Sequence, residues 1–212
     1  MMKQFQKLLK NNWQLLLILC FGAFLGLFQL DNLPAEMWGD ATAHYTLAQA
    51  VRHGFLFFNY QYGGDGPIYT YLAVFVSYFL GLSFYTLKFS SVLVYLLFIF
   101  FMYHLTDELF KKKEITYIAS FLSAVSFWSV TFARQPHARM LVPLFIVITL
   151  FFAVKKKTAV SGIFLGLGMY TQASFWAMPL VFWKHWKIIL IGLIIIIPLV
   201  ISFETGNVGF FT

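Results

Sequence analysis

The stretch PIYTYLAVFVSYFLGL, residues 67–82, decides the topology of this chain. It is strongly apolar, yet it falls short of the roughly 20 residues that a helix needs to cross a bilayer. Whether it crosses determines the side of the membrane on which every later loop lies. The positions of the cationic residues distinguish between the two topologies.

If residues 67–82 do not cross, only Arg52, Lys88, Arg134 and Arg139 face the outside. All the other lysines then share the cytoplasmic side: Lys3, Lys7, Lys10, Lys111, Lys112, Lys113, Lys155, Lys156, Lys157, Lys184 and Lys187. If the segment crosses, both lysine triplets lie outside. Cytoplasmic loops carry the excess of Lys and Arg in polytopic proteins. We therefore predict that residues 67–82 stay on the outer side.

The composition is that of an integral membrane protein. Of the 212 residues, 60% are hydrophobic, 21% aromatic and only 11% charged, and the mean hydropathy is +0.78. Soluble globular domains carry roughly twice that share of charge. The net charge of +7 comes from short lysine clusters between apolar runs. This pattern marks cytoplasmic loops and excludes a nucleic-acid-binding face.

We expect an all-α polytopic membrane protein, a single module covering residues 1–212. Its first apolar run is long for a signal peptide and no small-x-small cleavage site follows, so it is predicted to be retained as a span. Cys20 is the only cysteine, which excludes an internal disulfide. About seven spans are predicted, at residues 13–30, 88–110, 114–133, 139–154, 158–172, 174–183 and 187–203.

Residues 31–87 then form one long extracytoplasmic segment with two non-spanning helices, at about 40–53 and 67–82. The first contains GDATAHYTLAQAVRHG, residues 39–54, in which Asp40 and His44 share one helical face. Asp is a favoured N-cap residue. In one interpretation Asp40 therefore caps the helix and His44 lies at the membrane interface. A catalytic role for Asp40 is compatible with it.

Two further polar stretches fall on the same predicted side. Asp65 lies in GGDGP, residues 63–67, a sequence that favours a turn followed by the start of a helix. Asp65 is therefore a candidate for a second N-cap. Arg134, His137 and Arg139 lie within FARQPHARM, residues 132–140. Arginines at a membrane edge serve as snorkelling anchors. The same residues without a neighbouring acid also suit a bound anion, because Arg contacts phosphate in a bidentate manner.

The ordered set of these motifs resembles a known family. The chain reads GDATAHYTLAQAVRHG, GGDGPIYTYL, LKFSSVLVYLL, FARQPHARMLVPLF and GIFLGLGMYTQASFWAMPL in succession. This resembles the GT-C class of membrane glycosyltransferases, most closely the protein O-mannosyltransferase and aminoarabinose transferase relatives of glycosyltransferase family 39. The resemblance covers roughly residues 13–203 and implies a GT-C-like bundle with two helices in its first outer loop.

The resemblance implies transfer of a sugar from a polyprenyl-phosphate donor to an acceptor on the outer side. By this comparison Asp40 matches the catalytic carboxylate, and Arg134 and Arg139 match the cations that meet the lipid phosphate. His137 is an additional candidate donor to that phosphate. Further candidate substrate-binding residues are His44, Asp65, Tyr170 and Gln172. The last two are equally well explained as interfacial belt residues.

The chain departs from the family pattern at several places. Ala41 stands where the family has Glu after Asp, and Lys88 stands where Arg is commoner. The match is to the shared N-terminal module alone, so a partner chain that supplies the C-terminal module is a candidate partner. The lipid bilayer and a polyprenyl-phosphate sugar are the expected partners. The sequence does not distinguish a protein, a lipid or a glycan as the acceptor of the sugar.

A metal is not obligatory for this reaction, because the donor carries its own leaving-group charge. Asp40 and Asp65 are possible ligands for a divalent metal, on weak grounds, since two scattered carboxylates seldom make a site.

A transporter, or a non-catalytic module that binds polyprenyl-phosphate sugars, is the alternative function. The span centres carry almost no charge, which favours surface chemistry over a transport pathway. We expect location in a bacterial or archaeal cell membrane, with the N-terminus in the cytoplasm.

Overall fold

The computed structural model describes residues 13–35, 39–61 and 64–204, and within these ranges the chain is helical. Its β contacts there are two isolated bridges, Gln61–Asp65 and Asp65–Gln172. The elements are α2 (Trp13–Leu27), α3 (Gly39–Arg52), α4 (Pro67–Leu80), α5 (Phe84–Phe110), α6 (Lys113–Val125), α7 (Phe127–Ala133), η2 (Ala138–Met140), α8 (Leu141–Val154), α9 (Thr158–Gly168), η3 (Ala173–Phe182), α10 (Trp186–Ile195) and α11 (Ile197–Glu204). The predicted all-α class is confirmed.

The longest element is α5, with 27 residues. Ser83 caps its start, because the serine Oγ accepts a hydrogen bond from the Thr86 backbone N–H at 3.1 Å. Lys111 ends it in the left-handed conformation, with φ 54°. At about 1.5 Å per residue the helix is roughly 40 Å long. Among the described residues it is the single helix long and apolar enough by itself to cross a membrane.

The other predicted spans are shorter or bent. α6 and α7 meet at an angle of 53° and pass the same length and composition test only as a pair. The further apolar helices have 10–17 residues. Helices occur at all seven predicted segments, but the 174–183 segment forms a 3₁₀ helix with Pro179 inside it. The number of membrane spans therefore stays a prediction.

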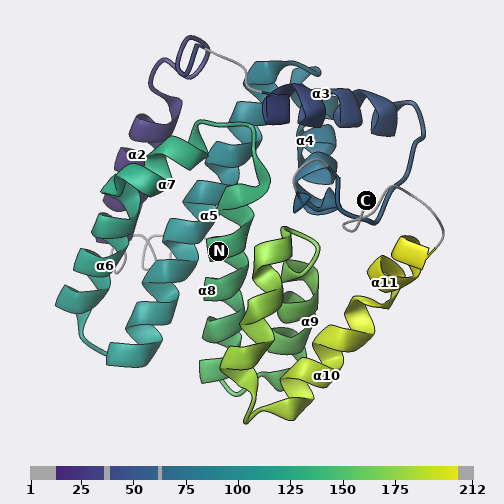
Figure 1. Ribbon diagram of the computed structural model, residues 1–212. Coiled ribbons are helices and arrows are strands. Elements are labelled where there is room, and N and C mark those ends of the chain that lie inside the picture. The colour runs from purple at the N-terminus through teal and green to yellow at the C-terminus, as the bar shows by residue number, and fades with distance from the viewer. Residues whose placement is uncertain (1–12, 36–38, 62–63, 205–212) are drawn as a thin grey trace, which may run out of the picture.

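α5 is the centre of the bundle. It contacts α2, α6, α8 and α4, while α9 packs between α8 and α10 (Figure 1). The core contains Tyr95 and Ile99 of α5, Leu144 and Ile148 of α8, and Leu165 of α9. These contacts pack α5, α8 and α9 side by side, and α3 and α4 lie together at one end of the bundle (Figure 1).

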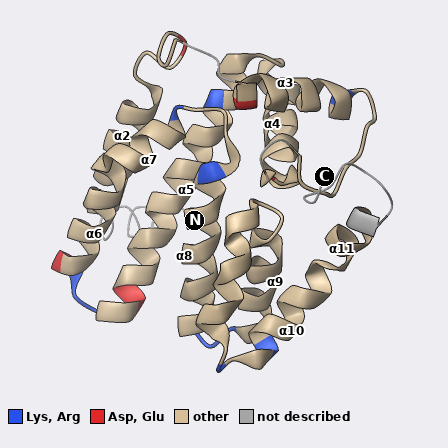
Figure 2. Ribbon diagram, in the orientation of Figure 1, with Lys and Arg blue, Asp and Glu red and all other residues tan. Residues whose placement is uncertain are grey.

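Charged residues gather at the two ends of the bundle and leave its middle apolar (Figure 2). The turns that carry the lysines, between α5 and α6, between α8 and α9, and at the start of α10, share one end (Figure 2). The α3 helix and the loop before η2 lie at the opposite end (Figure 1). This arrangement agrees with the positive-inside topology, in which residues 67–82 do not cross.

Small residues allow α9 to approach α10 closely. A Cβ added at Gly166 would lie 2.5 Å from the Ile195 Cβ and 2.8 Å from the Gly192 carbonyl oxygen. Gly162, one turn earlier, meets Ile191 in the same way. Packing of this kind is typical of helix pairs in membranes, where close van der Waals contact drives association.

This interface generates a stability prediction. Gly166→Ala forces α9 and α10 apart, and overpacking of this kind costs about 1–3 kcal/mol. We expect a lower midpoint of thermal unfolding for the purified protein in detergent. Gly39→Ala is the matched control, because a Cβ there meets no atom of the described residues within 4 Å. Equal unfolding midpoints for the two variants would contradict the packing described.

Candidate functional site

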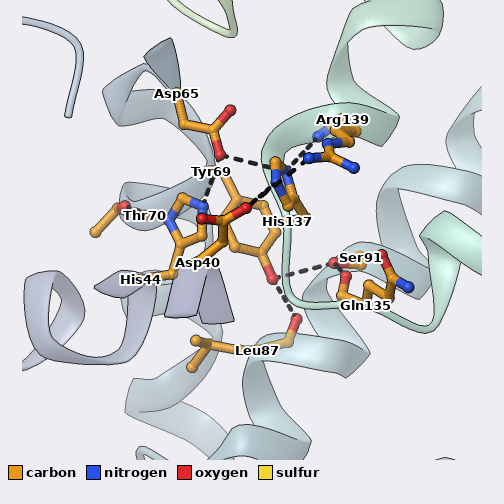
Figure 3. A network of polar contacts seen from close by, with 10 residues as sticks. All are labelled: Asp40, His44, Asp65, Tyr69, Thr70, Leu87, Ser91, Gln135, His137 and Arg139. Atoms are coloured by element: carbon orange, nitrogen blue, oxygen red, sulfur yellow. Dashed lines mark hydrogen bonds and ion pairs between the residues drawn. The ribbon is translucent and has the colours of Figure 1, made fainter. Parts of the chain in front are cut away.

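Three segments that are distant in sequence meet at the end of the bundle opposite the lysine turns. α3 supplies Asp40 in its first turn and His44 one turn later, and Asp65 directly precedes the N-cap of α4. His137 ends the loop between α7 and η2, and Arg139 lies in η2 (Figure 3). Asp40 and His44 share a face of α3 because they are four residues apart. The structure thus brings together five of the residues predicted for the site.

Asp40 is the solvent-facing member of this group. Its Oδ2 lies 3.3 Å from His137 Nε2 and 3.8 Å from Arg139 Nη2, and 46% of its side chain is exposed. The Arg139 guanidinium also lies 5.3 Å from the centre of the Phe132 ring. Asp40, His137 and Arg139 line one pocket, together with Gln135 and Pro34. A carboxylate, an imidazole and a guanidinium therefore face the same small opening.

Asp65 is the buried member, with 4% of its side chain exposed. Its Oδ2 lies 3.0 Å from His44 Nε2 and 3.2 Å from His137 Nδ1, whereas its Oδ1 has no hydrogen-bond partner among the described residues. The predicted capping role for Asp65 is wrong. The N-cap of α4 is Gly66, and no side chain caps it.

The backbone around Asp65 is held on both sides. Its N–H donates to the Gln61 carbonyl oxygen at 3.0 Å, and the next N–H, of Gly66, donates to the Thr171 carbonyl oxygen at 2.9 Å. A Cβ at Gly66 would lie 1.8 Å from the Tyr170 carbonyl oxygen, so only glycine permits this approach. The corner between α9 and η3 therefore fixes the position of the Asp65 carboxylate.

His44 and the loop that carries His137 are each anchored to α4 or α5. His44 Nδ1 lies 3.5 Å from Thr70 Oγ1, and the Tyr69 ring packs edge-on against the His44 ring at 4.8 Å. Tyr69 donates its hydroxyl proton to the Leu87 carbonyl oxygen at 2.8 Å. Ser91 of α5 donates to the Gln135 carbonyl oxygen at 2.6 Å, which fixes the loop. Figure 3 shows these contacts side by side.

Burial is the main influence on His137. It lowers the pKa of this imidazole, and the positive charge of Arg139 and the neighbouring His44 act in the same direction. The carboxylates of Asp65 and Asp40 oppose the effect and raise the pKa. The neutral form of His137 is therefore favoured by its surroundings, and a neutral imidazole offers one nitrogen as a donor and the other as an acceptor.

Arg134 does not join this cluster. Its guanidinium donates to the carbonyl oxygen of Leu25, in the last turn of α2, at 2.8 Å and to that of Leu33, in the turns after this helix, at 3.3 Å. Lys88, 1% exposed, donates to the Leu30 and Pro34 carbonyl oxygens in the same region. The Leu25 carbonyl is one of the last carbonyls of α2, which have no partner within the helix and carry partial negative charge, so the Arg134 cation stabilises it.

Tyr170 and Gln172 lie behind Asp65 rather than in the pocket. The Tyr170 hydroxyl donates to the Ile195 carbonyl oxygen at 3.0 Å and accepts from the Leu199 backbone N–H at 3.2 Å. Gln172 forms the second β-bridge to Asp65, and its Oε1 accepts from Ser174 at 3.2 Å. Their substrate-binding role stays a prediction. The bridge from Gln172 supports the backbone at Asp65, whereas the Tyr170 hydroxyl connects the end of α9 with the junction of α10 and α11.

Sequence reasoning missed the contacts of Thr70 and Ser91 and the convergence of His44, His137 and Asp65. Thr70 follows Asp65 by five residues at the start of an expected helix, which is a usable signal for a site residue. No sequence spacing predicts that His44, Asp65 and His137 meet, because they lie on three separate segments. Tertiary contacts alone bring them together.

The two arginines are expected to behave differently when replaced. Arg134→Met leaves the Leu25 and Leu33 carbonyls uncapped, and each lost charged hydrogen bond costs about 1.5–3 kcal/mol. We expect a clear drop in the unfolding midpoint. Arg139→Met removes a side chain that is 38% exposed and paired with an exposed acid, so its effect on stability is below about 1 kcal/mol. Thermal unfolding of both variants in detergent measures the difference, and a reversed order would contradict these contacts.

No protein-family model matches this chain, and it has no match among curated proteins or solved structures. The family resemblance of its motifs therefore stays a prediction. The site geometry, taken together with that resemblance, is the basis on which a function is proposed.

Proposed function

We propose that this protein is a polytopic membrane glycosyltransferase of the GT-C type, which moves a sugar from a polyprenyl-phosphate donor to an acceptor at the extracytoplasmic face. One observation carries the proposal. Asp40 is half exposed beside Arg139 and His137, in a pocket at the end of the bundle opposite the lysine turns. The donor phosphate of a membrane-bound lipid lies at the depth of such an end.

The pocket residues match the needs of the reaction. The acceptor hydroxyl attacks the anomeric carbon, its proton passes to the Asp40 carboxylate, and the bond from that carbon to the phosphate oxygen breaks. A base of this kind contributes about 10²–10⁴-fold. Arg139 stabilises the charge that develops on the departing lipid phosphate. A direct displacement of this kind inverts the anomeric centre.

The cation in this proposal is Arg139 rather than Arg134. The Arg134 guanidinium donates to two backbone carbonyls, of Leu25 in α2 and of Leu33 after it, whereas Arg139 is 38% exposed and lines the pocket with Asp40. His137 holds the other side of the Asp40 carboxylate at 3.3 Å and limits its rotation. A partner chain that presents the acceptor is compatible with this arrangement.

Replacement of Asp40 tests the proposed chemistry. Membranes that contain the protein are supplied with radiolabelled polyprenyl-phosphate hexoses, and label transfer to endogenous acceptors is counted. We expect Asp40→Asn to lower transfer by about 10²–10⁴-fold, the usual contribution of a general base. Glu114→Gln, which removes an exposed carboxylate in the first turn of α6, beside the lysine turn, is expected to leave transfer unchanged. Undiminished transfer by the Asp40 variant would remove this residue from its role.

The proposed orientation has a separate test. In a Cys20→Ser background, single cysteines replace Asn32, in the exposed turn after α2, and Lys112, in the turn between α5 and α6. An impermeant maleimide should label intact cells at position 32 only, because the lysine turns are expected on the cytoplasmic side. Permeabilised cells should label at both positions. Labelling at position 112 in intact cells would reverse the topology.

A further inference from the structure

The three buried side chains beneath Asp40 have the composition of a metal site. One atom each from His44, Asp65 and His137 lies within 4.8 Å of the others, and all three residues are buried. The two measured edges of this triangle are 3.0 Å from His44 Nε2 to Asp65 Oδ2 and 3.2 Å from His137 Nδ1 to the same oxygen. Ligands on a tetrahedral ion with bonds of about 2.0–2.1 Å are separated by about 3.3 Å.

The contacts of His137 place a lone pair toward this centre. Its Nδ1 lies 3.3 Å from the Arg139 backbone N–H, which is a donor, so this nitrogen acts as an acceptor. The ring proton is then on Nε2, where the Asp40 carboxylate accepts it at 3.3 Å. The unprotonated Nδ1 consequently faces the carboxylate oxygen of Asp65 at 3.2 Å. A cation beside Asp65 Oδ2 would take over the Nδ1 lone pair from this long backbone contact and would join the two atoms.

The outer nitrogens of both imidazoles have partners suited to metal ligands. A ligating histidine donates its other N–H to a carboxylate or another acceptor, which fixes the tautomer and the ring orientation. His137 has Asp40 in this position, and His44 has Thr70 Oγ1 at 3.5 Å from its Nδ1. The Tyr69 ring holds the plane of His44 from the side.

An unpaired atom supplies an independent observation. Asp65 Oδ1 is buried and has no hydrogen-bond partner in the described part of the chain. A buried carboxylate oxygen without a partner costs free energy, and buried charges are usually paired or coordinate metals. A cation held by the carboxylate would satisfy this oxygen and the two imidazoles together.

We propose that His44, Asp65 and His137 bind a divalent transition-metal ion, with Zn²⁺ the best fit to the donor set. Two imidazole nitrogens and one carboxylate suit zinc or iron and do not suit Mg²⁺ or Ca²⁺, which take oxygen ligands. The ion ties α3, the start of α4 and the loop before η2 to one point. Asp40 orients the ligand His137 from outside. The inference does not depend on the proposed sugar transfer.

The test uses the full chain, purified in detergent with a streptavidin-affinity tag, since a polyhistidine tag binds metal. We expect about one equivalent of zinc per chain by elemental analysis after dialysis against trace Zn²⁺. Removal of the ion by a chelator should lower the unfolding midpoint, and Zn²⁺ but not Mg²⁺ should restore it. Co²⁺ added to the metal-free protein should give the visible d–d absorption of a low-symmetry site.

Variants locate the ion within the chain. His44→Gln, Asp65→Asn and His137→Gln should each weaken zinc binding by more than about tenfold. His53→Gln, at the end of α3 and outside the cluster, should retain one equivalent. Stoichiometry unchanged in all three ligand variants would overturn the assignment.

The wild-type protein gives a result that does not depend on whether variants fold. If it holds no metal, gives no cobalt spectrum and unfolds at the same temperature with and without Zn²⁺, the cluster instead shares protons and the proposal is wrong. Sugar transfer is not read in any of these measurements. Failure of the metal site and failure of the proposed activity are therefore distinguishable.

Discussion

The burial of the Asp65 carboxylate is the constraint on which the rest of the site depends. A carboxylate with 4% exposure is tolerated only where donors or cations surround it. His44 Nε2 and His137 Nδ1 lie beside its Oδ2 at 3.0 and 3.2 Å, and they come from α3 and from the loop before η2. Their meeting at this oxygen fixes α3 across the end of the bundle. Asp40, on the same face of α3, is thereby placed beside Arg139.

The long helix α5 provides the rigid support for this arrangement. Ser91 holds the loop that carries His137, and Lys88 holds the chain just after α2 through two carbonyl oxygens. The compact ammonium of Lys88 fits a position that is 1% exposed. Arg134 reinforces the same region from the adjacent loop. Cations at this end of the bundle thus divide between structural contacts and the pocket, where Arg139 lies.

Much of the helical organisation could be predicted from the sequence. The predicted helices at 40–53 and 67–82 correspond to Gly39–Arg52 and Pro67–Leu80, because polar turn residues bound them. The predicted end of the helix near Lys111 also agrees with the structure, in which α5 ends at Phe110, because the lysine triplet interrupts the apolar run. Apolar runs alone could not predict the bend between α6 and α7 or the 3₁₀ form of η3. Hydrophobic length does not report either feature, and η3 contains Pro179, which cannot donate a backbone hydrogen bond.

The sequence by itself determined the helical class, the separation of the lysine clusters from the arginines and the identity of the polar residues at one end. These follow from composition and hydropathy, which act locally along the chain. Only the tertiary structure decided which polar residues meet. It separated Arg134 from Arg139, and it placed Asp65 in the centre rather than at a helix cap. The physical reason is that a buried carboxylate needs partners that are close in space, whatever their distance along the chain. His44 lies 21 residues before Asp65, and His137 lies on a loop far after it.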